Sequence, residues 1–323
     1  MMKNIIDTAK KEEYSSMRFN EEKRAELMDV LSIYEEITEE QKRKIIDHVG
    51  NILNYTPRIG VFGKTGSGKS SLCNALFGKD ICRVSDVESC TRDIQEVELS
   101  AGRSIVLLDV PGVGETRDRD AEYSQLYRSL LPELDAILWL VKGDDRAYSV
   151  DIDFYNYVVK EHVEHEKPFI VVLNQIDKIE PFREWNIPER KPGTKQKQNI
   201  RRKIEAVSTG FGIHTADVIP ISAEEKYGLV NLVDELIISL PDKKRITVLS
   251  EVKKENRSEK SVEESMSGFI RAIICAVKYA NVGGSMGTRI GFTLAGPAGV
   301  VVGKIVGTVV GAVVGFVSGL FSW

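Results

Sequence analysis

Apolar residues in the middle of the chain fall into short continuous runs that alternate with stretches of helical spacing. The runs predict β-strands at 58–62, 104–108, 136–141, 169–173 and 218–221, and alternation of apolar and polar residues predicts another at 94–99. Apolar residues at steps of three and four predict helices at 69–77, 150–163 and 229–240. Because strands and helices alternate, we expect an α/β domain whose mostly parallel sheet is covered by helices on both faces. The Ala101-Gly102 turn between two consecutive strands predicts one antiparallel strand at the edge.

Helical patterns flank this α/β domain on both sides. Residues 3–55 carry apolar residues at helical steps among many Lys and Glu, and Thr56-Pro57 ends that region. Residues 242–260 are highly charged and predict a helix or a linker, and 262–282 predict a helix with one apolar face. The predicted segments are therefore an N-terminal helical segment (1–56), an α/β domain (57–241), a helical linker with an amphipathic helix (242–282) and a C-terminal segment (283–323). The first and the last two predict an all-α module.

The C-terminal segment 283–323 has a different composition from the rest of the chain. It contains no acidic residue and eleven of the 26 glycines, and six of these form a glycine zipper: Gly299, Gly303, Gly307, Gly311, Gly315 and Gly319. Each interior glycine costs a helix about 0.8–1.0 kcal/mol relative to alanine, so we expect close helix contact along the stripe to offset this cost. Residues 298–321 form a helix of about 36 Å, long enough to span a bilayer. Membrane association is the first interpretation, and a buried hairpin packed on the N-terminal helices is the alternative.

Net charge, cysteine spacing and the N-terminal sequence limit the possible ligands and the cellular location. The formal net charge is −4 over 44 basic and 48 acidic residues, which argues against a general nucleic-acid binder. The four cysteines lie in no metal-binding spacing and are expected to be reduced thiols. The N-terminus lacks the apolar core of a secretory signal, so we expect a cytoplasmic protein, with attachment to the inner membrane through 283–323 as a further hypothesis.

A phosphate-binding loop follows the first predicted strand. The sequence GKTGSGKSS, from Gly63 to Ser71, fills the pattern G-x-x-x-x-G-K-[ST] between a strand and a helix. Its glycines allow backbone N–H groups to surround an anion, and the helix N-terminus adds partial positive charge. In this loop Lys69 is expected to reach the β- and γ-phosphates, and the Ser70 hydroxyl is expected to bind Mg²⁺. The nucleotide-binding residues predicted here are Gly63, Lys64, Thr65, Gly66, Ser67, Gly68, Lys69, Ser70 and Ser71.

Three further motifs follow later strands. Asp109-Val-Pro-Gly112 places a carboxylate at a strand end, where Asp109 could hold Mg²⁺ through water, and the Gly112 N–H can approach a γ-phosphate. Asn174-Gln175-Ile176-Asp177 ends a strand on the same sheet edge. The carboxylate of Asp177 can accept from guanine N1–H and N2–H₂, whereas adenine N1 is an acceptor. Backbone N–H groups of Ser222-Ala223 could contact the guanine carbonyl, so the predicted ligand is GTP or GDP.

These motifs, in this order, resemble those of translation-factor-related GTPases. They are GKTGSGKS, Thr91 within TRD, DVPG, NQID and SA, and they cover about residues 57–240. The match is most similar to the TrmE–Era group and the bacterial YfjP/YkfA-type GTPases, with some similarity to immunity-related and dynamin-like GTPases. The resemblance implies a P-loop G domain in which Thr91 closes onto Mg²⁺ and γ-phosphate. It also implies catalytic roles for Lys69, Thr91 and Gly112, Mg²⁺ binding by Ser70, Thr91 and Asp109, and a homodimer through the G domain as one mode of activation.

The chain departs from that family pattern at three positions. Val113 stands where many GTPases place a water-orienting glutamine, Gly66 replaces the P-loop asparagine of potassium-activated members, and Gln175 replaces a lysine beside the base. We therefore expect slow hydrolysis that needs a partner, dimerisation or an arginine such as Arg92, Arg117 or Arg146. Residues 179–198 predict a structured insertion near the base.

Three functional hypotheses follow. The first is a GTPase switch that is membrane-associated or self-assembling. The second is a slowly hydrolysing GTP-dependent scaffold, and the third is an Era-like ribosome or RNA assembly factor.

Overall fold

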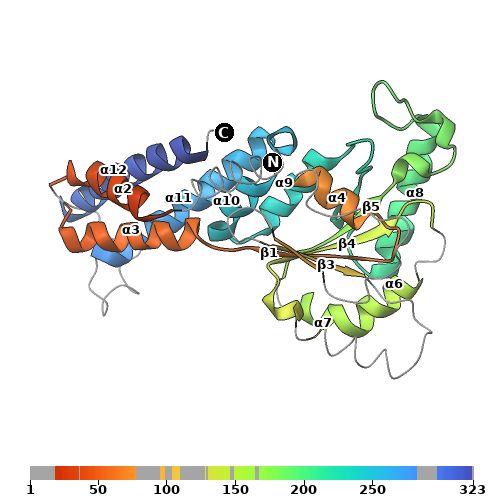
Figure 1. Cartoon of the computed structure of the whole chain (residues 1–323), viewed down its shortest axis with the longest axis horizontal. Helices are drawn as coiled ribbons and strands as arrows, with labels where there is room; N and C mark the ends of the chain where they lie inside the picture. The colour runs from red at the N-terminus through yellow and green to blue at the C-terminus, as the bar shows by residue number, and fades with distance from the viewer. Residues whose placement is uncertain are drawn as a thin grey trace, which may run out of the picture. The chain divides into compact units, whose positions relative to one another are not determined.

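The computed structural model describes residues 19–35, 37–77, 95–98, 104–109, 128, 130–145, 149–163, 167–281 and 297–321. The chain divides into two compact units. One, which we call the α/β unit, comprises 57–240 and 251–258. The other, the helical unit, comprises 1–56, 241–250 and 259–323. Figure 1 shows both, with labels on the α-helices and on β1, β3, β4 and β5.

The α/β unit is built on a six-stranded sheet with the strand order β2-β3-β1-β4-β5-β6. The strands are β1 (Arg58–Gly63), β2 (Gln95–Glu98), β3 (Ser104–Asp109), β4 (Ala136–Lys142), β5 (Phe169–Asn174) and β6 (Val218–Pro220). All neighbours are parallel except β2 and β3, which pair antiparallel at the edge. The predicted fold class, a mostly parallel sheet with one antiparallel edge strand, is confirmed.

Helices cover both faces of this sheet (Figure 1). They are α4 (Lys69–Leu76), α6 (Ser149–Phe154), a π-helical turn (Tyr155–Val159), α7 (Lys160–Val163), α8 (Thr194–Phe211) and α9 (Leu229–Ser239). Short 3₁₀ turns occur at Leu131–Glu133, Ile176–Lys178, Phe182–Glu184, Thr215–Asp217 and Lys254–Asn256. On one face, Trp139 of β4 is fully buried and stacks on Phe62 at 5.6 Å between ring centroids. Strands buried on both faces explain why the predicted apolar runs were nearly continuous.

The predicted insertion is shorter than expected at its C-terminal end. Helix α8 begins at Thr194, inside the range 179–198 that the sequence assigned to a loop. Its N-cap residue is Gly193, which has no side chain to cap the helix, and the Glu184 carboxylate accepts from the backbone N–H of Lys195 at 2.9 Å instead. Glu184, eleven residues before Lys195, therefore caps the helix. A pattern of neighbouring residues does not reveal this contact.

The helical unit contains five helices in its described residues. They are α2 (Glu21–Ser32), α3 (Glu39–Leu53), α10 (Asp242–Glu251), α11 (Glu259–Asn281) and α12 (Pro297–Phe321). Thr38 caps α3 in a capping box with Gln41. One apolar core joins all of them; among its fully buried members are Leu27, Val49, Ile246, Phe269 and Val313. The all-α module predicted from the two ends of the chain is confirmed.

The face by which α12 packs differs from the prediction. Val309, Val313 and Val317 are fully buried in the core of the helical unit. The intervening glycines at 307, 311, 315 and 319 are exposed, and no atom lies within 4 Å of a Cβ built on any of them. Among the described residues, α12 therefore packs through its valine stripe rather than its glycine stripe, because valine buries more apolar surface. Among the described helices, none has the length and apolar character that a bilayer span requires.

This packing predicts that Val313→Asp will strongly destabilise the helical unit. An aspartate at this fully buried position would place a carboxylate in an apolar core, and the free energy of unfolding should fall by about 2–5 kcal/mol. Urea unfolding followed by circular dichroism measures the effect. The matched control is Gly311→Ala on the exposed stripe, which should raise stability by up to about 1 kcal/mol. Loss of stability in the glycine variant alone would contradict the assignment of the buried face.

Candidate functional site

The P-loop lies between the end of β1 and the start of α4. Gly68, at the helix N-cap, has a φ of 91°, and no side chain caps the first turn of α4. A Cβ on Gly68 would lie 2.4 Å from the Asn174 Nδ2, so only glycine fits here. The helix therefore begins with uncapped backbone N–H groups, a favourable arrangement for binding phosphate. Ser70 and Ser71 lie in the first turn of α4, and Thr65 and Ser67 lie in the loop before it.

The two P-loop lysines are arranged differently. Lys69 Nζ donates to the carbonyl oxygens of Gly63 at 2.8 Å and Lys64 at 3.1 Å, which holds it inside the loop. Lys64 instead forms ion pairs with Asp151 at 3.0 Å and Asp145 at 3.5 Å. Burial raises the pKa of the Asp151 carboxyl, and its hydrogen bond with Lys64 opposes that rise. Lys69 thus lies inside the P-loop, and its contact with phosphate stays a prediction, whereas the Lys64 side chain anchors the loop to Asp151 of α6.

Asn174 joins three predicted parts of the site. Its Nδ2 donates to the Ser67 carbonyl in the P-loop at 2.8 Å, and its Oδ1 accepts from the backbone N–H of Ala223 at 3.1 Å. Gln175 has a φ of 60°, and its Nε2 donates to the Gly66 carbonyl at 2.9 Å. Asn174 is almost fully buried, so these bonds lie in a low-dielectric environment. The C-terminal end of β5 and the residue after it therefore connect the P-loop to the loop after β6 by hydrogen bonds.

The Ser222 and Ala223 amides have protein partners in the described structure, and their predicted contact with a guanine carbonyl stays a prediction. Ser222 N–H donates to the Tyr227 carbonyl at 3.1 Å, and Ala223 N–H donates to Asn174. The reason is that the loop folds back on itself through a bridge between Ser222 and Tyr227. In this conformation the loop supports Asn174.

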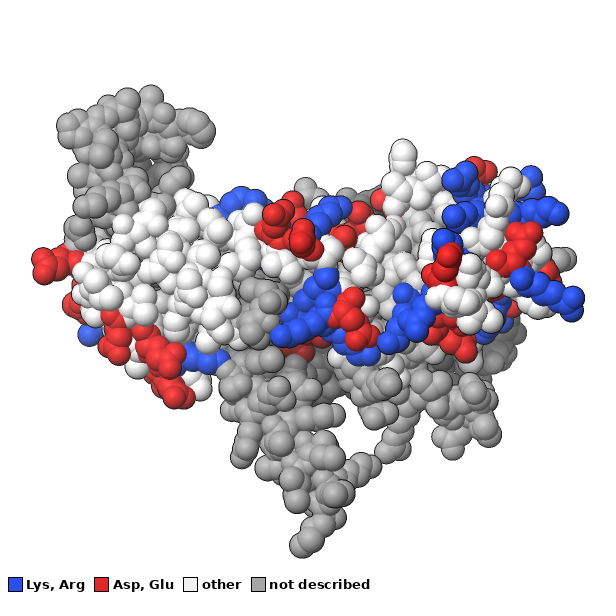
Figure 2. Space-filling view, turned by 90° about the horizontal axis from the view of Figure 1, so that it is seen from above, with Lys and Arg blue, Asp and Glu red and all other residues white. Residues whose placement is uncertain are grey.

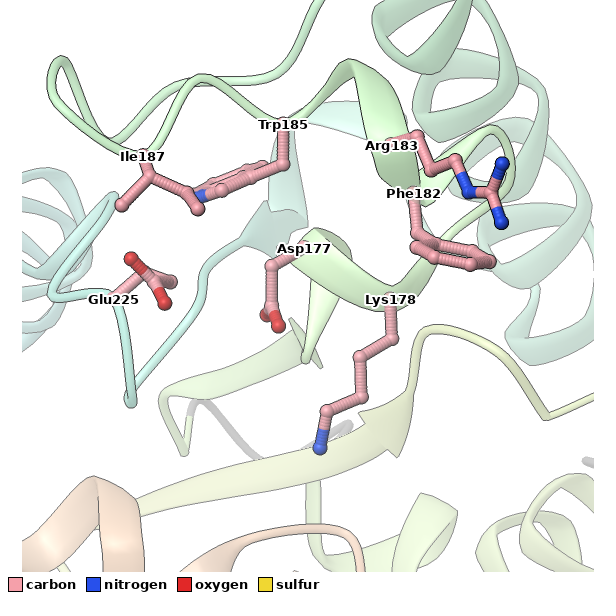
Figure 3. Close-up of a pocket in the computed structure, with 7 residues that line it drawn as sticks. All are labelled: Asp177, Lys178, Phe182, Arg183, Trp185, Ile187 and Glu225. Carbon is pink, nitrogen blue, oxygen red and sulfur yellow. The ribbon is translucent and has the colours of Figure 1, made fainter.

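A cavity of about 490 Å³ opens beside Asp177. Figure 3 shows its lining residues, which are Asp177, Lys178, Phe182, Arg183, Trp185, Ile187 and Glu225. The Oδ1 atom of Asp177 is buried and has no hydrogen-bond partner among the described residues, and the same holds for Trp185 Nε1. The residue Asp177 lines this cavity, and a carboxylate at a cavity is a candidate acceptor for the N–H donors of a ligand.

Gln196 positions Asp177, a role that the sequence analysis missed. Its side chain is fully buried, and its Nε2 contacts the carbonyl oxygens of Asp177 at 3.0 Å, Ile179 at 2.9 Å and Ile176 at 3.4 Å. These contacts fix the backbone on both sides of Asp177 from the first turns of α8. The only sequence signal is a glutamine on the apolar side of the α8 pattern, four residues before Ile200.

Gln196→Ala is therefore expected to weaken guanine nucleotide binding without unfolding the chain. Loss of the contacts to three buried carbonyls frees the Asp177 backbone, and the affinity for GDP should fall roughly tenfold. Calorimetric titration with GDP measures this change. The control is Gln198→Ala, at an exposed position on the same helix, which should leave the affinity unchanged. Equal affinities of the two variants would remove the positioning role from Gln196.

The predicted metal residues are described only in part. The parallel register pairs Asp109 at the end of β3 with Gly63, which puts Asp109 next to the start of the P-loop. Thr91, Gly112 and Val113 lie outside the described residues, as do Arg92, Arg117 and Arg146. Among the residues that are described, no group of three His, Cys, Asp or Glu side chains forms a metal site. A metal held here would therefore depend on Ser70, Asp109 and a phosphate ligand.

Comparisons with known proteins agree with this geometry. Residues 58–175 match the family model described as a 50S ribosome-binding GTPase. The uncharacterized Escherichia coli (strain K12) proteins YkfA and YfjP are 42% and 40% identical over 228 residues, which is 70% of this chain and 77% of each relative. The GTPase Era of Lacticaseibacillus paracasei is 26% identical over 186 residues, 57% of this chain and 53% of that protein. A solved structure of Aquifex aeolicus Era bound to GDP and AlF₄⁻ is 25% identical, with a TM-score of 0.42 over 58% of this chain and 57% of that one.

The match to YkfA and YfjP covers more than two thirds of those proteins. The family model covers β1 to the end of β5, which includes the P-loop and Asn174. The predicted guanine nucleotide is the ligand of this class of G domain. The chain therefore belongs to the YkfA and YfjP family of P-loop GTPases, and its GTP-binding G domain is related to those of Era and Der.

Proposed function

We propose that this chain binds GTP, hydrolyses it to GDP and phosphate with Mg²⁺, and acts as a molecular switch. The observation that carries the proposal is the cavity lined by Asp177 just after β5, a strand whose C-terminal end lies on the same sheet edge as the P-loop. In this proposal the uncapped N-terminus of α4 binds the phosphates, and the carboxylate of Asp177 binds the base of the same nucleotide.

The carboxylate of Asp177 selects guanine over adenine. Guanine presents two donors, N1–H and N2–H₂, to the two carboxylate oxygens, whereas adenine presents an unprotonated N1. A buried acceptor facing another acceptor costs roughly 1–3 kcal/mol, and the lost bonds add to this. The rigidity supplied by Gln196 and Asn174 strengthens the selection, because the carboxylate cannot move away from the wrong base.

The phosphate end is provided by the P-loop. Backbone N–H groups at the start of α4 and Lys69 would bind the β- and γ-phosphates. Ser70 and Asp109, with Thr91 by family resemblance, would hold Mg²⁺, which neutralises charge on the phosphate oxygens. The uncapped helix start and the fit of only glycine at position 68 support this assignment.

Hydrolysis is proposed to be slow in the isolated chain. Water must be oriented in line with the γ-phosphate, and Val113, after the DVPG motif, has no group that can hold it. A slowly hydrolysing scaffold is accordingly the second candidate function. A partner or a second copy that supplies the missing group would convert the scaffold into the switch.

The experiment that tests the proposal is a titration of the full chain with GDP and ADP, followed by single-turnover hydrolysis of GTP with Mg²⁺. We expect GDP to bind at least about 10²-fold more tightly than ADP. Complete conversion of bound GTP, even at a low rate, supports the GTPase, and a bound nucleotide that stays GTP supports the scaffold. Equal binding of GDP and ADP would rule out the base assignment.

The proposal includes no membrane role for residues 283–323. The valine stripe of α12, which would face lipid or another helix, is already buried in the core of the helical unit. Dimerisation through the G domain enters only as one source of the missing catalytic group.

A further inference from the structure

The insertion and the first half of α8 form a basic surface inside an acidic protein. Residues 178–203 contain nine Lys or Arg and three Glu, a net charge of +6 in a chain whose total is −4. Figure 2 shows blue side chains gathered at the end of the α/β unit that carries α8, with fewer red ones among them. The net charge of the whole chain, from which nucleic acid was judged an unlikely partner, conceals this local excess.

The three acidic residues of this segment are engaged within it. The Glu184 carboxylate caps α8 by accepting from the N–H groups of Lys195 and Gln196. Glu189 pairs with Lys191, and Glu180 accepts from the Phe182 N–H at 3.4 Å. None of these three carboxylates forms an ion pair with a described Lys or Arg side chain of α8.

Four of these cations, which we call the α8 cations, lie on the exposed side of the helix. They are Lys195, Lys197, Arg201 and Arg202, opposite the buried side chains of Gln196, Ile200 and Val207. None of the four forms an ion pair with a carboxylate of the described residues, and only Arg202 has a side-chain partner there, the Asn199 Oδ1 at 3.4 Å. Their charges are consequently available to a ligand.

The insertion is fixed on the same surface. Asn199 Nδ2 donates to the Glu180 carbonyl at 2.7 Å, and Gln196 holds Ile179, so the insertion and α8 move as one body. This places exposed apolar side chains beside the cations: Phe182 is 49% exposed and Ile187 is 73% exposed. Figure 3 shows Arg183 directed away from Asp177, and its guanidinium lies 6.0 Å from the Phe182 ring centre. Cations beside an exposed aromatic ring are typical of protein surfaces that bind single-stranded nucleic acid.

We propose that the α8 cations and the insertion bind the phosphate backbone of a single-stranded nucleic acid. Charge complementarity favours a polyanion, and the exposed ring of Phe182 offers a base a stacking surface that a lipid headgroup or an acidic protein does not use. The α8 cations lie outside the phosphate-binding loop, whereas Phe182 and Ile187 also line the Asp177 cavity. Nucleic-acid binding by the GDP-loaded chain is therefore a second activity of the G domain. Its absence would leave the proposed GTPase function intact.

The test uses the full chain loaded with GDP and fluorescein-labelled single-stranded RNA and DNA of about 20 nucleotides, followed by fluorescence anisotropy. At about 50 mM salt, changing all four α8 cations to Glu should raise the Kd at least tenfold. Each lost phosphate contact lowers the salt slope by about 0.7, so the slope should fall by up to about 3. The oligonucleotide with the lower Kd, RNA or DNA, identifies which nucleic acid the surface prefers.

The matched control carries the same change of net charge at other exposed positions. In it, Arg43, Lys44, Lys160 and Lys243 are all changed to Glu. Its Kd should rise less than about threefold, because distant charges are screened by salt. Both variants are first titrated with GDP, and unchanged affinity shows that the G domain is folded. If the Glu variant fails that check, the same four positions are changed to Gln, for which the loss of affinity and slope is also expected.

Three results would overturn the proposal. In the first, the wild type binds neither RNA nor DNA at low salt. In the second, the control variant loses as much affinity as the α8 variant, which would show that only total charge matters. In the third, vesicles containing anionic lipid, or poly-glutamate, bind through the α8 cations while the oligonucleotides do not.

Discussion

Replacing Lys69 by alanine is expected to abolish measurable GTP turnover. Lys69 begins α4, and its Nζ is held by the carbonyls of Gly63 and Lys64 at the centre of the P-loop. In the proposed complex it reaches the phosphates, where negative charge shifts as the γ-phosphate leaves. Loss of one such preorganised donor lowers rates by about 10²- to 10³-fold, and the proposed slow wild-type rate would place the remainder below detection. Phosphate release under single-turnover conditions measures the effect.

The control for this prediction is Lys160→Ala, an exposed lysine on α7. Removing the same side chain there should leave turnover unchanged, which excludes a general effect of lost charge. If Lys69→Ala hydrolyses GTP at the wild-type rate, the assignment of Gly63 to Ser71 as the phosphate-binding loop is wrong.

Replacing Asp177 by asparagine is expected to change the base that the site prefers. In the proposed complex the Asp177 carboxylate accepts from guanine N1–H and N2–H₂, and asparagine replaces one of its oxygens by an NH₂ group that opposes guanine N2–H₂. The affinity for GDP should fall by about 10²-fold. Xanthosine diphosphate, which carries a carbonyl at position 2, should bind the variant more tightly than it binds the wild type. Competition against a fluorescent guanine nucleotide measures both affinities.

Glu225→Gln provides the matched control, because Glu225 lines the same cavity with another carboxylate. It should change the GDP affinity by less than about threefold, since its role is not tied to the base donors. A gain of xanthosine diphosphate binding in the Glu225 variant, and not in the Asp177 variant, would move the base site to the other side of the cavity.

The sheet and the position of the P-loop were predictable because their signals are local. The apolar runs at 136–141 and 169–173 can be covered on both faces only in a parallel sheet, and β4 and β5 extend one residue beyond each. The pattern around Gly68 and Lys69 needs only a strand before it and a helix after it, and β1 and α4 provide both. Asn174 and Asp177 follow from the same rule, because parallel strands bring their carboxyl ends to one edge.

The role of Gln196 could not be predicted, because it depends on tertiary contacts. The position of Gln196 four residues before Ile200 puts it on the apolar side of α8, but only the fold shows that its side chain contacts three carbonyls. The start of α8 was missed for the same reason, since Glu184 caps the helix from the insertion.

The packing of α12 shows a different difficulty. Valines at 309, 313 and 317 repeat every four residues, as the glycines do, so periodicity alone does not distinguish the two faces. The glycine pattern predicted packing along the glycines, whereas the helix packs along the valines because their branched side chains bury more apolar surface.

The helical unit has a consequence for how the chain is made on the ribosome. Helices α2 and α3 are synthesised first, but α11 and α12, which cover them, follow about 200 residues later. All residues of the α/β unit have been added by position 258, before either covering helix exists. A nascent chain at that stage can fold its G domain while Leu27 and Leu31 still lack their final neighbours. Completion of the helical unit is thus a late step, and the exposed faces of α2 and α3 are natural targets for chaperones until it occurs.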